Sequence, residues 1–264
     1  MRALAAIVLT LAAASPAAAE TIAIPFAPPV DQRLTYRIVQ HRPVGGKPSR
    51  FTAARELRFE RDGAGYLLRC TLTSIDSDAP DEGAAAFRAA LTPLTGIAMT
   101  FRVDAAGRIT GLDNLDSVWQ SVERGQKAMQ DGLKDGPRKK AAAAVGTLFA
   151  SLSPPARLAL LAGELQPLFL FAGSQVEAGP AGRGVRTVAG SPLGRPVPVE
   201  GVLRVKGQGD GAVDLEENLS GTGIALSMTY RVSRTTGLVE GQNRALAVGS
   251  ESLTENRTLA AASN

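Results

Sequence analysis

The sequence is poor in the side chains that most enzymes use for chemistry. Its 264 residues include one histidine, one cysteine and one tryptophan. A serine–histidine–aspartate triad would have to use His41, and no Gly-x-Ser-x-Gly motif presents a serine to it. His41 stands at the end of an expected strand, where we expect it to face solvent. One histidine and one cysteine cannot build a zinc site of the usual type, and no EF-hand spacing of carboxylates is present. We therefore expect no enzymatic activity, no bound metal and no cofactor.

Two adjacent carboxylates, Glu216 and Glu217, are candidates for acid–base chemistry by their proximity alone. Neighbouring residues of a strand point to opposite faces of its sheet. A pair that cleaves glycosidic bonds must instead face one site. The spacing therefore argues against a shared catalytic role.

A single cysteine, Cys70, excludes a disulfide within the chain. It alternates with Tyr66, Leu68 and Leu72 in a segment typical of a strand. We expect its thiol to be a buried part of the core.

The positive charge is too small and too scattered to indicate a nucleic-acid partner. The formal net charge is +4 and the aromatic content is 5%, whereas nucleic-acid binding favours a clustered basic face with aromatics. The one dense group contains Lys134, Arg138, Lys139 and Lys140. It is typical of a solvated helix face, and the alternative is contact with anionic lipid headgroups.

The first nineteen residues, MRALAAIVLTLAAASPAAA, have the pattern of a signal peptide. Arg2 precedes a short apolar run, and Ala17-Ala18-Ala19 forms an A-x-A cleavage site. An N-terminal membrane anchor is the competing interpretation, but the apolar run is short for a span. We expect cleavage after Ala19, a periplasmic location and no transmembrane span in the mature chain.

Period-two alternation of apolar residues predicts several strands before and after the middle of the chain. Two stretches share the motif Met-Thr-aromatic-Arg-Val, IAMTFRVDAAGRITG at 97–111 and LSMTYRVSRTTGLVEG at 226–241. Two further stretches, from Leu57 and from Leu203, each consist of a strand, a glycine turn and a strand. The alternatives are an internal duplication and a chance likeness between β-hairpins. We favour a duplication, with a short extra helix at 81–91 in the first unit.

Between the two units, residues 113–172 are expected to be helical. Gly136-Pro137 should end one helix and start another, and Ser153-Pro154 should start a third. Leu158, Leu161, Leu165 and Leu168 form an apolar stripe in the last part of this segment. The stripe is typical of a helix that covers a sheet, and the alternative is a role in gating a ligand.

These features predict an α+β fold, a curved antiparallel sheet or half-barrel built from two repeated β units and covered by the helices inserted between them. We expect a signal peptide at 1–19 and one domain at 20–264. That domain contains a first β unit at 20–112, a helical insert at 113–172 and a second β unit at 173–264.

The signal peptide, the units ending FRVDAAGRITG and YRVSRTTGLVEG, and the helical cover make this arrangement similar to the periplasmic lipoprotein-carrier and mycobacterial lipid-transfer fold. In that fold, helices close a half-open β-barrel. The resemblance implies non-enzymatic binding of acyl chains and carries over no catalytic residue.

We therefore expect an exported protein that binds or carries a lipid or another hydrophobic molecule between sheet and helices. The alternative is a structural or protein-interaction module of the cell envelope, with a filled core and an envelope protein as partner. The expected ligand-binding residues are the inward side chains of the two motifs and the leucine stripe: Met99, Phe101, Met228, Tyr230, Leu158, Leu161, Leu165 and Leu168.

Two arginines, Arg102 and Arg231, occupy equivalent places in the two motifs. The simpler interpretation is a pair of solvent-facing strand residues. The alternative is a symmetric pair that binds an anionic headgroup or a partner.

Overall fold

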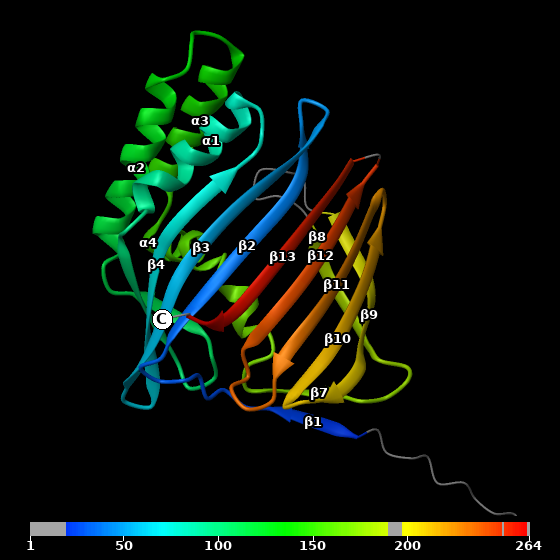
Figure 1. Cartoon of the computed structure of the whole chain (residues 1–264). Helices are drawn as coiled ribbons and strands as arrows, with labels where there is room; N and C mark the ends of the chain where they lie inside the picture. Colours follow the sequence, from blue (N-terminus) through cyan, green and yellow to red (C-terminus); the bar gives the residue numbers. More distant parts are fainter. Residues whose placement is uncertain (1–19, 190–196, 250, 263–264) are drawn as a thin grey trace, which may run out of the picture.

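A large curved antiparallel sheet dominates the computed structural model (Figure 1). The structure describes residues 20–189, 197–249 and 251–262, so the expected signal peptide lies outside the described residues. The strands are β1 (Thr21–Ile24), β2 (Arg33–Val44), β3 (Lys47–Asp62), β4 (Gly65–Ser77), β5 (Ala98–Val103), β6 (Ile109–Leu112), β7 (Ser174–Glu177), β8 (Arg183–Ala189), β9 (Val197–Gly209), β10 (Ala212–Gly221), β11 (Ile224–Ser233), β12 (Val239–Val248) and β13 (Glu251–Ala261). The helices are α1 (Asp81–Leu91), η1 (Thr92–Leu94), α2 (Leu115–Asp131), α3 (Pro137–Ser151), α4 (Pro154–Ala162) and η2 (Gln166–Phe169).

Eleven of the described strands form the main sheet, in the order β6-β5-β4-β3-β2-β13-β12-β11-β10-β9-β8. From β2 the chain meanders outward to the edge at β6. It then passes through the helices to the other edge at β8 and meanders back to β12 and β13. The short strands β1 and β7 pair with each other outside this sheet. The expected fold class, α+β with a large curved antiparallel sheet, is confirmed.

The two pairs of similar stretches occupy corresponding places in this meander. The hairpins from Leu57 and Leu203 are β3–β4 and β9–β10, and the two motif strands are β5 and β11. Helices α1 and η1 separate β4 from β5, whereas only Thr222 and Gly223 separate β10 from β11. The arrangement agrees with the inserted helix at 81–91. An ancestral duplication stays a prediction.

Alternation decides which side chains face inward. In β4 the residues Tyr66, Leu68, Cys70 and Leu72 are buried, and the positions between them are more exposed. The turn from β9 to β10 consists of Asp210 and Gly211, which both adopt positive φ, at 46° and 72°. That backbone matches the twist of the flanking strands and favours Asp-Gly.

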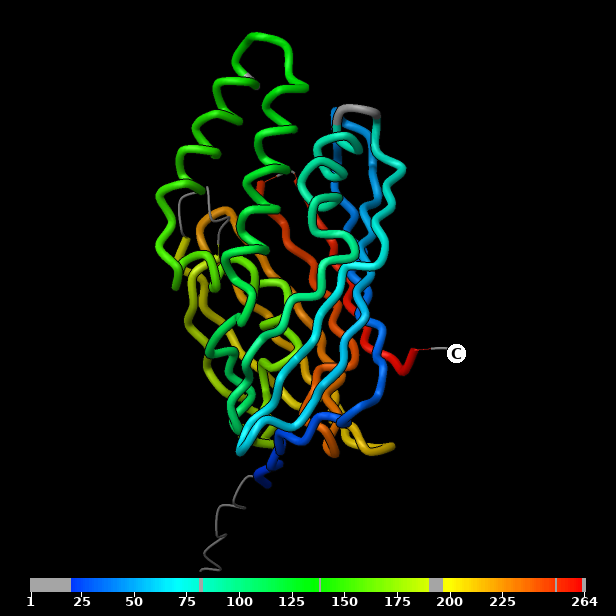
Figure 2. Tube along the Cα trace, turned by 90° about the vertical axis from the view of Figure 1, so that its left-hand side faces the viewer, coloured from blue at the N-terminus to red at the C-terminus, as the bar shows by residue number. Residues whose placement is uncertain are grey.

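The helical insert divides into two parts. Helices α2 and α3 form a hairpin that packs against α1 and η1, and both views place this group together at one end of the molecule (Figure 2). Helix α4 and η2 instead lie against the concave face of the sheet and contact α2, β6 and β12. The cover of the sheet therefore consists of α4, η2 and the first turn of α2, whose Leu115 and Val118 belong to the same core, while the rest of α2 and α3 extend beyond it.

Within the described part of the chain, no single helix has the length and hydropathy of a membrane span. The consecutive segments Lys139–Ser151 and Pro154–Ala162 have that length and hydropathy only when they are taken together, and the chain bends by 117° between them.

Two apolar clusters fill the region under this cover. The first joins β2–β6 to α4 and η2, with Phe59, Leu68 and Phe101 completely buried at its centre. The second joins β9–β12 to β1, β7 and Phe171, whose ring lies 5.1 Å from that of Tyr230, edge to face. Aromatic pairs favour this geometry. The part of the concave face that these two clusters occupy, which we call the lower half, is therefore a packed protein core.

Cys70 reports on the integrity of the first cluster. Its side chain is fully buried, and burial raises the pKa of the thiol to about 12. Because the thiolate is the reactive form, we expect no reaction with a thiol reagent at pH 8 in buffer and rapid reaction in denaturant. A colorimetric thiol assay with and without urea measures this. Rapid reaction of the native protein would contradict the placement of Cys70 in the core.

Candidate functional site

The structure divides the eight expected ligand-binding residues between the two clusters. The first cluster receives Met99, Phe101, Leu158, Leu161, Leu165 and Leu168. The second contains Tyr230, with Met228 packed against it. The alternation was therefore right about the inward side of Met99, Phe101, Met228 and Tyr230, but the eight residues belong to two clusters and do not line one common surface.

Most of these side chains are covered by protein atoms. Phe101 is 0% exposed and Leu165 and Leu168 are each 1% exposed, whereas Met228, Leu158 and Leu161 are half-buried. A ligand could touch Phe101 only after α4 and η2 had moved. A ligand-lining role for the eight residues stays a prediction.

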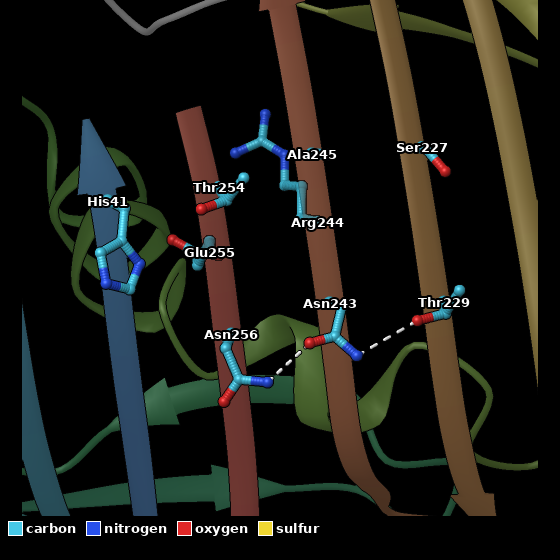
Figure 3. Close-up of a pocket in the computed structure, with 9 residues that line it drawn as sticks. All are labelled: His41, Ser227, Thr229, Asn243, Arg244, Ala245, Thr254, Glu255 and Asn256. Atoms are coloured by element: carbon cyan, nitrogen blue, oxygen red, sulfur yellow. Dashed lines mark hydrogen bonds between the residues drawn. The ribbon is translucent and has the colours of Figure 1, made fainter. Parts of the chain in front are cut away.

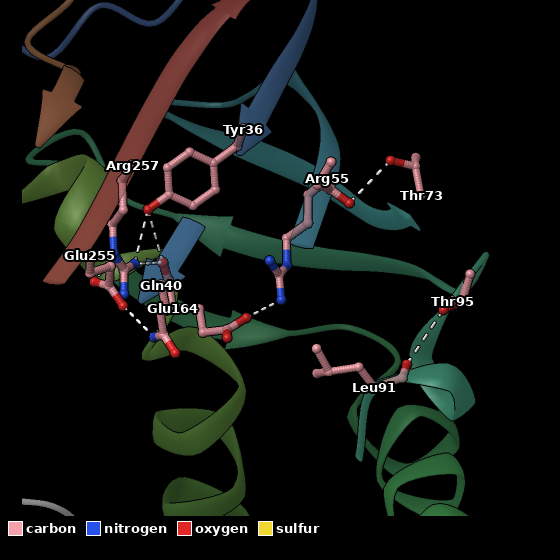
Figure 4. A network of polar contacts seen from close by, with 10 residues as sticks. Tyr36, Gln40, Arg55, Thr73, Leu91, Thr95, Glu164, Glu255 and Arg257 are labelled. Atoms are coloured by element: carbon pink, nitrogen blue, oxygen red, sulfur yellow. Dashed lines mark hydrogen bonds and ion pairs between the residues drawn. The ribbon is translucent and has the colours of Figure 1, made fainter. Parts of the chain in front are cut away.

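One junction fixes the cover to the sheet. Glu164 stands between α4 and η2, and its carboxylate forms an ion pair with Arg55 of β3. The backbone carbonyl of Glu164 accepts hydrogen bonds from the Tyr36 hydroxyl at 3.2 Å and from Nη1 of Arg257 at 2.7 Å. Figure 4 shows these contacts converging on Glu164 from β2, β3 and β13. One residue of the cover thus binds three strands.

The Arg55 side chain is only 4% exposed, so its positive charge is shielded from water and needs the Glu164 carboxylate as a partner. Its Nη1 atom is buried with no hydrogen-bond partner in the described structure. A buried guanidinium that loses its carboxylate is strongly destabilising, because it remains charged.

Glu255 of β13 forms the second half of the junction. Its carboxylate accepts a hydrogen bond from Nε of Arg257 at 2.6 Å and another from the Gln40 amide. Burial alone raises the pKa of Glu255, but the hydrogen bonds from Arg257 and Gln40 and the charges of Arg257 and Arg244 outweigh it. The net pKa is therefore lower than that of an ordinary glutamate.

Starting at the junction, to which Gln40 and Glu255 belong, the strand register arranges the concave face in two rows. The first, which we call the charged row, contains Gln40, Glu255, Arg244, Met228 and Glu217 on β2, β13, β12, β11 and β10. The next, which we call the leucine row, contains Leu253, Leu246, Leu226 and Leu219 on β13, β12, β11 and β10. Cross-strand partners share a face, so each row is a continuous line of side chains.

The two rows differ in burial along their length. Leu219 and Leu226 are buried, at 4% and 8% exposure, while Leu246 and Leu253 are half-buried. In the charged row, Glu217 is buried and accepts a hydrogen bond from the Tyr230 hydroxyl at 2.9 Å, and Arg244 is half-buried. An apolar line with open members thus lies directly beside fixed polar groups.

The opposite face of the same strands is shallowly hollowed. Two hollows of about 290 and 370 Å³ share Ser227, Ala245 and Thr254. Figure 3 shows the first, where the Asn256 amide donates to Asn243 at 2.7 Å and Asn243 donates to Thr229 at 3.3 Å. The hollows exist because the outward side chains here are small. His41 of β2 lines the first hollow and is exposed, as expected.

The other candidates from the sequence also lie on the outer face. Arg102 forms ion pairs with Asp113 and Asp62, and Arg231 lies 3.6 Å from Asp214. Both arginines are exposed, which agrees with the simpler interpretation of this pair. Glu216 is 3.5 Å from Lys206 on the outer face, whereas Glu217 faces inward, so the two carboxylates are separated as expected.

Sequence reasoning missed the junction residues Arg55, Glu164 and Glu255, and it missed Gln40 and Arg244 of the charged row. Arg55 has a visible signal, because it alternates with Leu57 and Phe59 and must therefore face the core. Arg244 and Glu255 have no such signal, since their alternating neighbours are both polar and apolar. Their position follows only from the pairing of β12 with β13.

No group of three or more histidine, cysteine, aspartate or glutamate side chains that could hold a metal ion occurs among the described residues.

Comparison with models of protein families found no match, and comparison with curated proteins found none either. Among solved structures, the chain is similar to one described as "Lipid-protein interactions in lipovitellin", with 8% identity and a TM-score of 0.40. The alignment covers 88% of this chain and 25% of that one, so this chain spans a quarter of the length of that structure's chain. The likeness is loose, and the lipid in that description is said of lipovitellin.

Replacing Glu164 tests the junction. In Glu164→Gln, Arg55 loses its only described counter-charge, and we expect the free energy of unfolding to fall by about 1–3 kcal/mol. Urea unfolding followed by circular dichroism measures the change. The control is Glu56→Gln, on the exposed face of β3 next to Arg55, which should change stability by less than about 0.5 kcal/mol. Equal effects of the two substitutions would contradict the role of Glu164.

The lowered pKa of Glu255 predicts a pH-dependent contribution to stability. A carboxylate with a depressed pKa in the folded protein stabilises it above the unfolded pKa, about 4.3, and loses that effect as the pH falls through the folded value. Compared with the wild type, Glu255→Gln should therefore be less stable at pH 6, with the difference shrinking toward pH 3. Urea unfolding at several pH values measures this. A difference independent of pH would contradict the assignment.

Proposed function

We propose that this chain is an exported, non-enzymatic protein that holds a lipid or another hydrophobic molecule against the concave face of its sheet. The expected export rests on the signal-peptide pattern of residues 1–19. The observation that carries the proposal is the leucine row, a line of four apolar side chains on four neighbouring strands.

The open members of that row are the reason to expect a ligand. Leu246 and Leu253 are half-buried and do not belong to the cluster that contains α4 and η2. Leu246 packs against Leu219 and Leu226, and both Leu246 and Leu253 keep part of their apolar surface in water. Covering such surface contributes about 25 cal/mol per Å². Half-buried Met228 lies diagonally beside Leu246 and supplies an adaptable thioether.

The binding surface proposed here lies higher on the concave face than the surface expected from the sequence. Met228 belongs to both. Phe101, Leu165 and Leu168 belong instead to the packed core of the first cluster, whereas the leucine row packs with Ala189 and Val199.

The outer hollows favour a second candidate, a protein-interaction module of the cell envelope. The residues that the two hollows share, Ser227, Ala245 and Thr254, have small, exposed side chains, so a partner can approach the sheet closely there. In this case no ligand would be bound to the concave face.

Native mass spectrometry of the protein, purified from its own periplasm without detergent, tests the proposal first. We expect additional mass that disappears on organic extraction. The extracted protein should then bind a neutral hydrophobic dye such as N-phenyl-1-naphthylamine.

Matched substitutions locate the bound molecule. Leu246→Gln should weaken dye binding about tenfold, because a buried leucine contact contributes about 1.5–3 kcal/mol. Ala247→Gln, the next residue on the outer face, should leave binding unchanged. A bare protein mass together with no dye binding by the wild type would overturn the proposal and favour the interaction module.

A further inference from the structure

The charged row contains one cation, Arg244, and one anion, Glu217, that form no direct ion pair among the described residues, although the charge of Arg244 also acts on neighbouring Glu255. Among the described residues, the guanidinium of Arg244 forms no hydrogen bond and no ion pair. The carboxylate of Glu217 accepts only the neutral Tyr230 hydroxyl, and no described cation pairs with it. The remaining charges of this region are matched, Arg257 with Glu255 and Arg55 with Glu164.

These two groups lie on one face at a defined spacing. Arg244 is opposite Met228 in the register, and Met228 is opposite Glu217, so one strand separates them. Adjacent strands are about 4.8 Å apart, which places the two backbones about 10 Å from each other. Both side chains are long enough to approach the same molecule above Met228.

Gln242 adds an unused acceptor. It is two residues before Arg244 on the same face of β12 and is 6% exposed. Its Oε1 atom is buried without a hydrogen-bond partner in the described structure. A buried acceptor in this state is costly and is satisfied by a donor from a ligand or a water molecule.

We propose that Arg244, Glu217 and Gln242 bind the polar head of the hydrophobic ligand, and that this head is zwitterionic. This proposal rests on the proposed function. A phosphate or carboxylate accepts hydrogen bonds from Arg244, and an ammonium group contacts Glu217 and Gln242. The acyl chain lies along the leucine row directly above.

Charge complementarity decides between head types. A purely anionic head can form an ion pair with Arg244 but approaches the carboxylates of Glu217 and Glu255, which repel it. A purely cationic head can pair with Glu217 but is repelled by the guanidinium groups of Arg244 and Arg257. Only a head with both charges pairs the cation and the anion that the protein leaves unpaired, and buried charges need such pairing.

The test uses single-chain amphiphiles with the same acyl chain and different heads. They are lysophosphatidylethanolamine, lysophosphatidylglycerol and monoacylglycerol, which are zwitterionic, anionic and neutral, and each displaces bound N-phenyl-1-naphthylamine. We expect the zwitterionic compound to bind about tenfold more tightly than either of the others, as charge-assisted hydrogen bonds predict.

Two substitutions should remove that preference. In Arg244→Gln and in Glu217→Gln, the zwitterionic compound should bind no better than monoacylglycerol, whose own affinity should not change. The amide that replaces the Glu217 carboxylate can still accept the hydrogen bond from Tyr230, so folding is preserved and is checked by circular dichroism. The controls are Glu216→Gln and Arg231→Gln, two charges on the outer face of the same strands, which should keep the preference.

The outcomes separate this inference from the function on which it rests. Equal binding of all three amphiphiles, or preference for the anionic one, would overturn the zwitterionic head and leave hydrophobic binding intact. Displacement by none of them, combined with no binding of the dye, would overturn both. A preference that survives in Arg244→Gln and Glu217→Gln would place the head elsewhere.

Discussion

The buried positive charge of Arg55 is the constraint on which the closed half of the molecule depends. A guanidinium stays protonated at any pH at which the protein is folded, so its burial requires a nearby carboxylate. Glu164 supplies that carboxylate from the joint between α4 and η2, and its carbonyl also binds Tyr36 and Arg257. The position of the cover over the sheet is therefore set by directional contacts, and the leucines of the cover pack around them.

This arrangement gives the concave face two different halves. Below the junction, aromatic and aliphatic side chains from both ends of the sheet fill the space, as for Phe101 and Phe171. Above it, the charged row and the leucine row continue over β10–β13, with Arg244, Leu246 and Leu253 half-buried. The lower half contributes stability, and the upper half has the surface that the proposed function requires.

Much of the local structure could be predicted because local signals decide it. The helix at 81–91, the break at Gly136-Pro137 and the turn at Asp210-Gly211 all occur where the residues favour them. The same signals gave the inward direction of Phe101 and Tyr230. They could not give the burial of each residue, because this depends on where α4 lies. They suggested a cover from the whole insert, although α4, η2 and the first turn of α2 supply it.

The sequence by itself determined the elements and the face of the sheet on which each side chain lies, since a period of two or 3.6 residues is a property of the local backbone. The tertiary structure alone decided which side chains are neighbours across strands. Gln40 and Glu255 are 215 positions apart and meet because β2 pairs with β13. Arg244 and Glu217 share a row because β10, β11 and β12 pair in one particular register. A shift of two residues would keep every face and destroy both rows, so alternation alone could not reveal them.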